Sequence, residues 1–160
     1  MAAFINTTLL PTVGPSTEKP ISEDTMNQNS AKTRGVHHVG LTVPDLAAAR
    51  AFFVDALGFE QVGEVADYPA VFLNDGATMI TLWQAEDPAN AIPFNRRTNI
   101  GLHHLALRVG TTSDLEQLYA ELRERNDLDI EFAPEGLGSS GLQHMMCRIP
   151  GNIRLELIAV

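Results

Sequence analysis

The chain has 160 residues, and a hydrophobic content of 44% is enough to bury the core of one soluble domain. Its net charge of −9 argues against nucleic acid or an anionic membrane surface as a partner. Its one cysteine, Cys147, excludes an internal disulfide, and no apolar run is long enough to cross a membrane. Because the N-terminus also lacks the basic residues of a secretory signal, we expect a cytoplasmic protein.

The first 34 residues are rich in Thr, Ser, Pro and Asn and show no hydrophobic period. Their three acidic and three basic residues cancel, so the excess negative charge lies entirely in residues 35–160. This composition predicts a disordered tail at 1–34 and a folded domain at 35–160. An alternative is that residues 4–10 dock on a partner subunit.

The first half of the domain begins with a predicted strand, Val36–Val43, which reads Val-His-His-Val-Gly-Leu-Thr-Val. Alternation places His38 on the face opposite the aliphatic side chains. An amphipathic helix is expected over residues 46–57, with Asp45 before it and Gly58 after it. Three strands are then predicted at 60–65, 70–73 and 78–83, with an Asn-Asp-Gly hairpin turn at 74–76.

The second half repeats this order after a polar linker, residues 85–101, that contains Arg96 and Arg97. Residues 102–109 read Leu-His-His-Leu-Ala-Leu-Arg-Val and form the second His-His strand. A helix follows, for which Ser113 and Glu116 have the spacing of a capping box. Further strands are predicted at 130–133, 143–149 and 153–158, with a glycine-rich loop at 134–141 that is either a hairpin connection or a lid.

The two halves therefore form an α+β fold of two βαβββ repeats, one at about 36–84 and the other at about 102–160. Each repeat exposes a sheet face that it cannot bury alone. We expect the repeats to pair into a curved mixed sheet that encloses a metal-binding cleft.

The candidate metal ligands are His38 and His104, at equivalent places in the repeat, and Glu156 on the last strand. Aligning Gly76 with Gly151 puts Thr81 where Glu156 stands, and a threonine hydroxyl is a poor ligand. Two histidines and one carboxylate with open coordination positions suit Fe(II), and also Mn, Co, Ni or Zn. The alternatives are ordinary strand histidines, and a Glu156 that is solvated or paired with Arg154.

Other side chains are expected to line the cleft or take part in the chemistry. Met79, Thr81 and Trp83 share one face of their strand, where Trp83 either stacks on a planar substrate or fills the core. Arg154 shares the face of Glu156. His144 is a candidate proton carrier on the neighbouring strand, and Arg96 with Arg97 either holds a substrate carboxylate or is solvated.

Three stretches together resemble the vicinal oxygen chelate superfamily: the two His-His strands and residues 150–157, Pro-Gly-Asn-Ile-Arg-Leu-Glu-Leu. That superfamily includes glyoxalase I, bleomycin- and fosfomycin-resistance proteins, methylmalonyl-CoA epimerase and type I extradiol dioxygenases. The resemblance spans Val36 to the C-terminus. It implies a divalent metal between paired βαβββ modules, held by His38, His104 and Glu156, and a homodimer that acts on a small molecule.

The resemblance leaves three functions open. A dioxygenase is favoured because ring-cleaving members use two histidines and one glutamate. A lyase or isomerase is the first alternative, with His144 as its base, although glyoxalase I carries a metal-binding Glu where this chain has Thr81. The second alternative is a resistance protein that sequesters a small molecule without metal.

Overall fold

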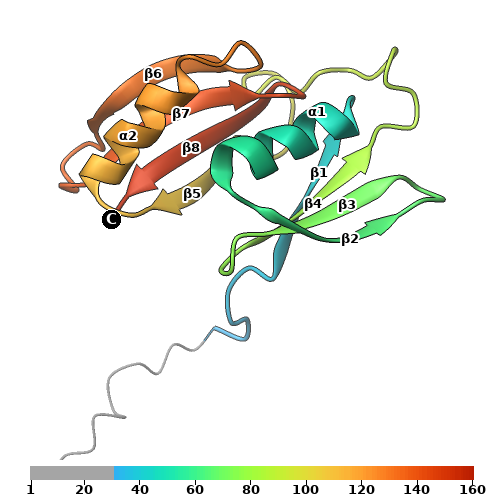
Figure 1. The fold of residues 1–160 in the computed structure, drawn as a ribbon, viewed down its shortest axis with the longest axis horizontal. Helices are drawn as coiled ribbons and strands as arrows, with labels where there is room; N and C mark the ends of the chain where they lie inside the picture. Colours follow the sequence, from blue (N-terminus) through green and yellow to red (C-terminus); the bar gives the residue numbers. More distant parts are fainter. Residues whose placement is uncertain (1–30) are drawn as a thin grey trace, which may run out of the picture. The chain divides into compact units, whose positions relative to one another are not determined.

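The structure is a computed structural model that describes residues 31–160, of which Gly35–Val160 form one compact unit. The element order is two βαβββ repeats in succession (Figure 1). Most of the predicted tail lies outside the described residues. Within residues 31–160, no helix has the length and apolar character needed to span a membrane.

The first repeat forms a four-stranded mixed sheet whose strand order is β1-β4-β3-β2. β1 runs parallel to β4, and the other neighbours are antiparallel. Its strands are β1 (His38–Val43), β2 (Glu60–Val65), β3 (Ala70–Asn74) and β4 (Met79–Gln84). Each lies within two residues of its predicted bounds.

The second repeat forms a separate sheet in the equivalent order, β5-β8-β7-β6, with β5 parallel to β8. Its strands are β5 (Leu105–Val109), β6 (Asp129–Gly136), β7 (Gln143–Ile149) and β8 (Ile153–Ala159). The predicted pair of βαβββ repeats is therefore confirmed, as two four-stranded sheets that do not close into a barrel.

Two boundaries in the second repeat differ from the prediction. β5 begins at Leu105, so the His-His pair of this repeat precedes the strand, whereas His38 is the first residue of β1. β6 extends to Gly136 through two register shifts, which shortens the predicted loop at 134–141. Bulges of this kind are not visible in an alternation pattern, which explains why the strand was predicted too short.

The strand registers show that the repeats are equivalent residue by residue. Gly40 on β1 lies opposite Thr81 on β4, and Ala106 on β5 lies opposite Glu156 on β8. Thr81 and Glu156 therefore occupy the same position in their sheets. This is the alignment that Gly76 and Gly151 suggested, and both glycines have positive φ, 93° and 89°.

The helix of the first repeat is α1 (Leu46–Ala51), which continues as a π-helix, η2 (Phe52–Ala56). The Asp45 side chain accepts a hydrogen bond from the Ala48 amide at 2.9 Å, as expected for an N-terminal cap. Gly58 follows with a φ of 74°, the left-handed conformation that favours glycine after a helix.

The helix of the second repeat is α2 (Thr112–Leu122), and its predicted cap was wrong. The N-cap is Thr111, whose hydroxyl accepts from the Asp114 amide at 3.3 Å. The Asp114 carboxylate in turn accepts from the Thr111 amide at 2.6 Å. Thr111 with Asp114 has the same spacing as Ser113 with Glu116, and Thr111 alone keeps the extended backbone of a cap (φ −83°, ψ 171°).

One hydrophobic core is shared by both repeats. It joins Leu41 and Phe53 of the first repeat to Leu107, Leu115 and Leu157 of the second, and it is packed against one face of each sheet. Cys147 belongs to this core and is fully buried, as expected for a structural thiol. Burial raises its pKa from 9.0 to about 12. The opposite face of each sheet is therefore the one available for a site.

Candidate metal centre and the adjoining cavity

Glu156 is the central acidic residue of the open face of the second sheet. It is 7% exposed, and both of its carboxylate oxygens have a histidine partner. Oε2 lies 3.1 Å from His104 Nε2, and Oε1 lies 2.5 Å from His144 Nδ1. His104 was predicted as a metal ligand and His144 as a proton carrier. Both contact the Glu156 carboxylate.

Each His-His pair is held in the same geometry. The Nδ1 atoms of His37 and His38 are 2.9 Å apart, and those of His103 and His104 are 2.8 Å apart. The rings in each pair are close to perpendicular. An imidazole whose Nδ1 is engaged in this way has Nε2 available for a metal ion, which is how second-shell partners orient histidine ligands.

The spacing between His104 Nε2 and Glu156 Oε2 fits a shared metal ion. Two ligands about 2.1 Å from one ion, at angles between octahedral and tetrahedral, lie about 3.0–3.4 Å apart. The observed separation is 3.1 Å. The two side chains therefore need little movement to bind one cation.

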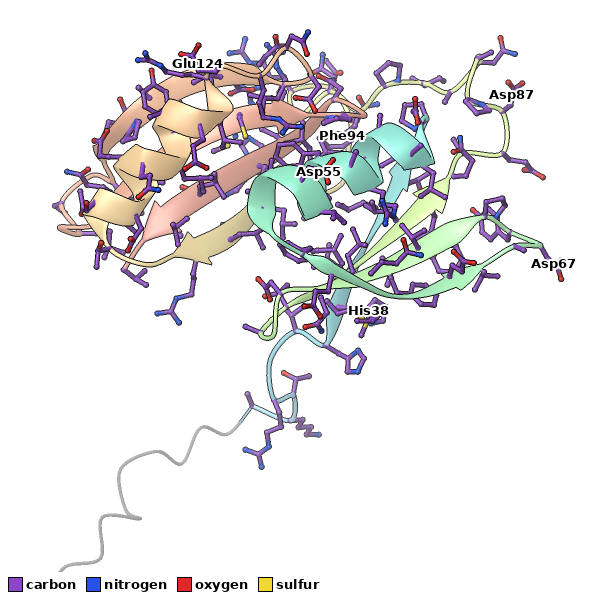
Figure 2. All side chains as sticks on the ribbon, in the orientation of Figure 1. His38, Asp55, Asp67, Asp87, Phe94 and Glu124 are labelled. Atoms are coloured by element: carbon purple, nitrogen blue, oxygen red, sulfur yellow. The ribbon has the colours of Figure 1, made fainter. Side chains whose placement is uncertain are left out.

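The third predicted ligand, His38, is on the other sheet, at the start of β1 (Figure 2). Its side chain is exposed, and its recorded partner is His37. Among residues 31–160, no group of three or more His, Cys, Asp and Glu side chains is arranged to hold a metal ion. Within residues 31–160 of one chain, His104 and His144 both contact Glu156, but these three side chains are not arranged as a complete metal site, and His38 contacts none of them.

On the first sheet, the position equivalent to Glu156 belongs to an apolar and aromatic surface. Thr81 is 6% exposed and accepts a hydrogen bond from the indole Nε1 of Trp83 at 3.0 Å. The Trp83 ring packs at 5.2 Å from Tyr68 and 6.1 Å from Phe72. One of the two lone pairs of the Thr81 hydroxyl is thereby used. Met79, also predicted for the cleft, is half-buried at the other end of the strand, in register with His38.

A cavity of about 450 Å³ adjoins the second sheet and contains several of the predicted polar residues. It is lined by Arg96 and Arg97 from the linker, by Arg148 from β7, and by Arg154 from β8. His103 also lines it, and the pKa of this imidazole is lowered by partial desolvation and then by the charge of Arg154. The structure thus places the linker arginines beside Arg154.

A second, more apolar cavity of about 220 Å³ lies between the repeats. Gly40 and Thr42 of β1 line it on one side, and His104 with Arg154 lines it on the other. The two cavities share Phe94, Asn152 and Arg154, so they are adjacent. Phe94 belongs to the linker (Figure 2), and its carbonyl accepts a hydrogen bond from the Asn152 side chain at 3.2 Å. His104 is therefore accessible from a cavity that reaches the first repeat.

Two residues of this region were not found from the sequence. Arg148 shares the strand parity of His144, which is the signal that would have placed it on the open face. Glu131 gave no such signal, because the bulges of β6 decide which way it points.

Comparison with known proteins agrees with this architecture. The profile of the Glyoxalase/Bleomycin resistance protein/Dioxygenase superfamily matches residues 35–157. The chain is 26% identical over 132 residues to the uncharacterized protein YqjT of Bacillus subtilis (strain 168), covering 78% of this chain and 98% of YqjT.

Solved structures show the same fold. A glyoxylase/bleomycin resistance protein/dioxygenase domain from Frankia sp. EAN1pec superposes with a TM-score of 0.68 at 24% identity, covering 79% of this chain and 92% of that chain. Lactoylglutathione lyase from Agrobacterium tumefaciens superposes with a TM-score of 0.61 at 20% identity, covering 81% of this chain and 96% of that chain.

The chain therefore belongs to the Glyoxalase/Bleomycin resistance protein/Dioxygenase superfamily, the vicinal oxygen chelate proteins. Members of this superfamily are often enzymes, commonly use divalent metals and commonly form dimers.

Proposed function

We propose that this protein is a metal-dependent enzyme that binds a divalent ion through His38, His104 and Glu156. The observation that carries the proposal is the placement of His104 Nε2 and Glu156 Oε2 at 3.1 Å on the open face of the second sheet. A buried carboxylate is costly unless cations or hydrogen bonds compensate it. Glu156 is compensated here by two imidazoles, both of which are also metal-ligand groups.

We further propose that His38 reaches the ion from a second copy of the chain. The single chain holds His104 with Glu156 and leaves His38 exposed on the other sheet. A two-fold dimer that places the first sheet of one copy against the second sheet of its partner would complete two identical sites. This arrangement makes the homodimer part of the site.

When bound, the ion would supply Lewis-acid stabilisation of a substrate chelated through two neighbouring oxygens, or would activate dioxygen. The chain's own groups orient the ligands and carry the proton. His103 and His37 fix the two histidine rings through Nδ1. His144 Nδ1 lies 2.5 Å from Glu156 Oε1 and orients that carboxylate. The same imidazole would accept or donate the proton in the reaction.

Within this class we favour a dioxygenase that uses Fe(II). Two histidines and one carboxylate with open positions are the ligand set of non-haem iron oxygenases. Thr81, at the position of a fourth ligand, already accepts a hydrogen bond from Trp83, which supports a three-ligand site. Mn, Co, Ni or Zn would fit the same donors.

A lyase or isomerase is the second candidate, and the observation that favours it is His144. This imidazole is 13% exposed and close to the proposed metal, which suits a base that moves a proton next to a polarised carbonyl. A protein that sequesters a small molecule without metal is the third candidate. The lone buried cysteine is compatible with a reducing, cytoplasmic environment for all three.

Subunit mixing tests the shared metal site. His38→Ala and His104→Ala dimers are each expected to lose metal. If the site is shared, a heterodimer of the two has both defects in one site and a wild-type second site. Mixing equal amounts under exchange conditions should then restore about a quarter of the wild-type metal content, because about half of the dimers are heterodimers and each has one intact site of two. Recovery of none would contradict the shared site, and full metal in either single variant would contradict the ligand assignment.

The reaction class is tested with the metal-loaded protein. A dioxygenase should consume dioxygen in equal amount to the catechol that disappears, since both oxygen atoms enter the ring-cleaved product. A lyase or isomerase should convert its substrate under anaerobic conditions. Stoichiometric binding of an unchanged ligand by metal-free protein would favour sequestration instead.

A further inference from the structure

The larger cavity is strongly basic in an acidic protein. Four of the 11 Lys and Arg residues in the sequence line it, namely Arg96, Arg97, Arg148 and Arg154. Among residues 31–160, Glu131 is the only carboxylate in its lining. The whole chain has a net charge of −9, so this concentration of guanidinium groups runs against its overall charge.

Glu131 contacts three of these arginines. Its Oε2 accepts from Arg154 Nε at 2.8 Å, and its Oε1 lies 3.5 Å from Arg96 Nη1 and 3.8 Å from Arg148 Nε. Arg148 Nη2 also lies 3.9 Å from Asp129 Oδ2, so two carboxylates face four guanidinium groups. Arg97 has no carboxylate within 4.0 Å among residues 31–160. The cavity therefore keeps positive charge that no described carboxylate of the chain neutralises.

The arrangement differs from a solvated surface pair. The side chains of Arg154 and Glu131 are only 15% and 14% exposed, and the cavity between them and the linker has room for a small organic acid, at about 450 Å³. Planar guanidinium groups that converge on one space are suited to carboxylate and phosphoryl oxygens, which they bind in a bidentate manner.

The cavity is next to the candidate metal centre. Arg154 is two residues before Glu156 on β8, on the same face, which separates their Cα atoms by about 7 Å. Arg154 also lines the neighbouring cavity together with His104. A ligand of a few carbon atoms would span the distance from the metal ligands to the arginines.

We propose that this cavity, the arginine pocket of Arg96, Arg97, Arg148 and Arg154, binds an oxyanion of the substrate, either a carboxylate or a phosphoryl group. The proposal rests on the proposed function, in that the other end of the substrate is the one chelated at His104 and Glu156. The preferred substrate is then a small organic acid with vicinal oxygens a few bonds from its anionic group. Glu131 contacts three of the arginines and competes with that group for them.

The test measures anion binding to the full chain by calorimetry at constant ionic strength. The probes are inorganic phosphate and malonate, and malonamide is the uncharged control. Wild-type protein should bind at least one of the two anions and should not bind malonamide. Preference between phosphate and malonate identifies the anionic group as phosphoryl or carboxylate. Equal binding of malonamide, or no binding of either anion, would overturn the proposal.

Three variants link the binding to the pocket. Arg97→Gln and Arg154→Gln should each weaken anion binding by about tenfold, since each removes a charge-assisted contact. Arg97 is exposed, so its variant is expected to fold even if Arg154→Gln is unstable. Arg123→Gln is the matched control, because Arg123 is exposed on the far end of α2 and pairs with Glu124. Wild-type affinity in Arg97→Gln would contradict the proposal.

Glu131→Gln should change the anion affinity in the direction opposite to the arginine variants. If the arginines exist to bind a substrate anion, removing their internal competitor should strengthen phosphate or malonate binding severalfold. If the cluster is only an internal ion-pair network, loss of Glu131 disorders the arginines and anion binding is weakened or unchanged. A weaker or unchanged affinity in a folded Glu131→Gln protein would therefore contradict the proposal.

Running these titrations with metal-free and metal-loaded protein separates the two proposals. Anion binding without any metal binding would leave the arginine pocket standing and remove the metal site. Metal binding without anion binding would leave the metal site standing and overturn the arginine pocket.

Discussion

The two repeats share a backbone and differ in the chemistry of their open faces. Gly40 faces Thr81 in the first sheet as Ala106 faces Glu156 in the second. Around Thr81 the neighbours are aromatic, whereas around Glu156 they are histidines. The register of a duplicated sheet therefore fixes where a functional side chain points, and the side chains themselves decide whether that position carries chemistry.

The largest expected effect is on metal affinity, and it should differ between Glu156 and the equivalent residue Thr81. Glu156→Ala should lower the affinity for a divalent metal by at least about 100-fold, because it removes a charged ligand. Thr81→Ala, at the equivalent position, should leave the affinity nearly unchanged. Both are checked by competition with a fluorescent chelator, with circular dichroism as the control for folding. Equal losses in the two variants would contradict the asymmetry between the repeats.

Thr81→Glu places the carboxylate of the second sheet on the first. Its neighbours there are Trp83 and the other aromatic side chains. A buried carboxylate without a cationic partner should destabilise the fold by roughly 2–4 kcal/mol. Thr81→Val, which removes only the hydroxyl that Trp83 contacts, should cost about 1 kcal/mol. Urea unfolding measures both, and a Thr81→Glu protein as stable as wild type would show that the first face is more polar than described.

The caps of the two helices differ in kind, and that of α2 is a reciprocal capping box centred on Thr111. Thr111→Ala should destabilise the protein by about 1 kcal/mol through loss of the N-cap. Ser113→Ala should change stability by only a few tenths of a kcal/mol, because Ser113 is inside the first turn. Chemical denaturation of both variants checks this. A larger loss of stability in Ser113→Ala than in Thr111→Ala would support Ser113 as the cap instead.

Cys147 lies in the shared core and not on either open face, so its reactivity tests that assignment. Burial raises its pKa to about 12, so the native thiol should react with a disulfide reagent at pH 8 only as fast as the protein unfolds. The folded chain keeps its proton above pH 9, where the unfolded chain begins to lose it. Stability is therefore expected to fall as the pH rises beyond about 9. Rapid labelling in native buffer, with full labelling in denaturant as the control, would contradict this burial.

The sequence was sufficient for the fold because the His-His stretch occurs twice, the turn glycines Gly76 and Gly151 align, and alternation assigns the faces of the strands. It also selected Glu156, whose position depends only on strand parity. It did not place Glu131 or the cap at Thr111. The first depends on β-bulges, and the second on which of two equally spaced pairs adopts the extended backbone.

The relation between His38 and the other ligands was also beyond the sequence. A repeat shows that two histidines are equivalent, and it does not show whether one chain brings them together. In this chain, His104 meets Glu156 and His38 remains exposed. That is the reason for proposing a site completed by a second copy.

The most direct test of the central claim is the metal content of the full chain, purified anaerobically without a histidine tag and measured by elemental analysis. The account predicts about one divalent ion per chain, with iron favoured, and its loss in Glu156→Ala. Protein that contains no metal, and takes up none on reconstitution, would contradict the metal site and leave small-molecule sequestration as the function of this fold.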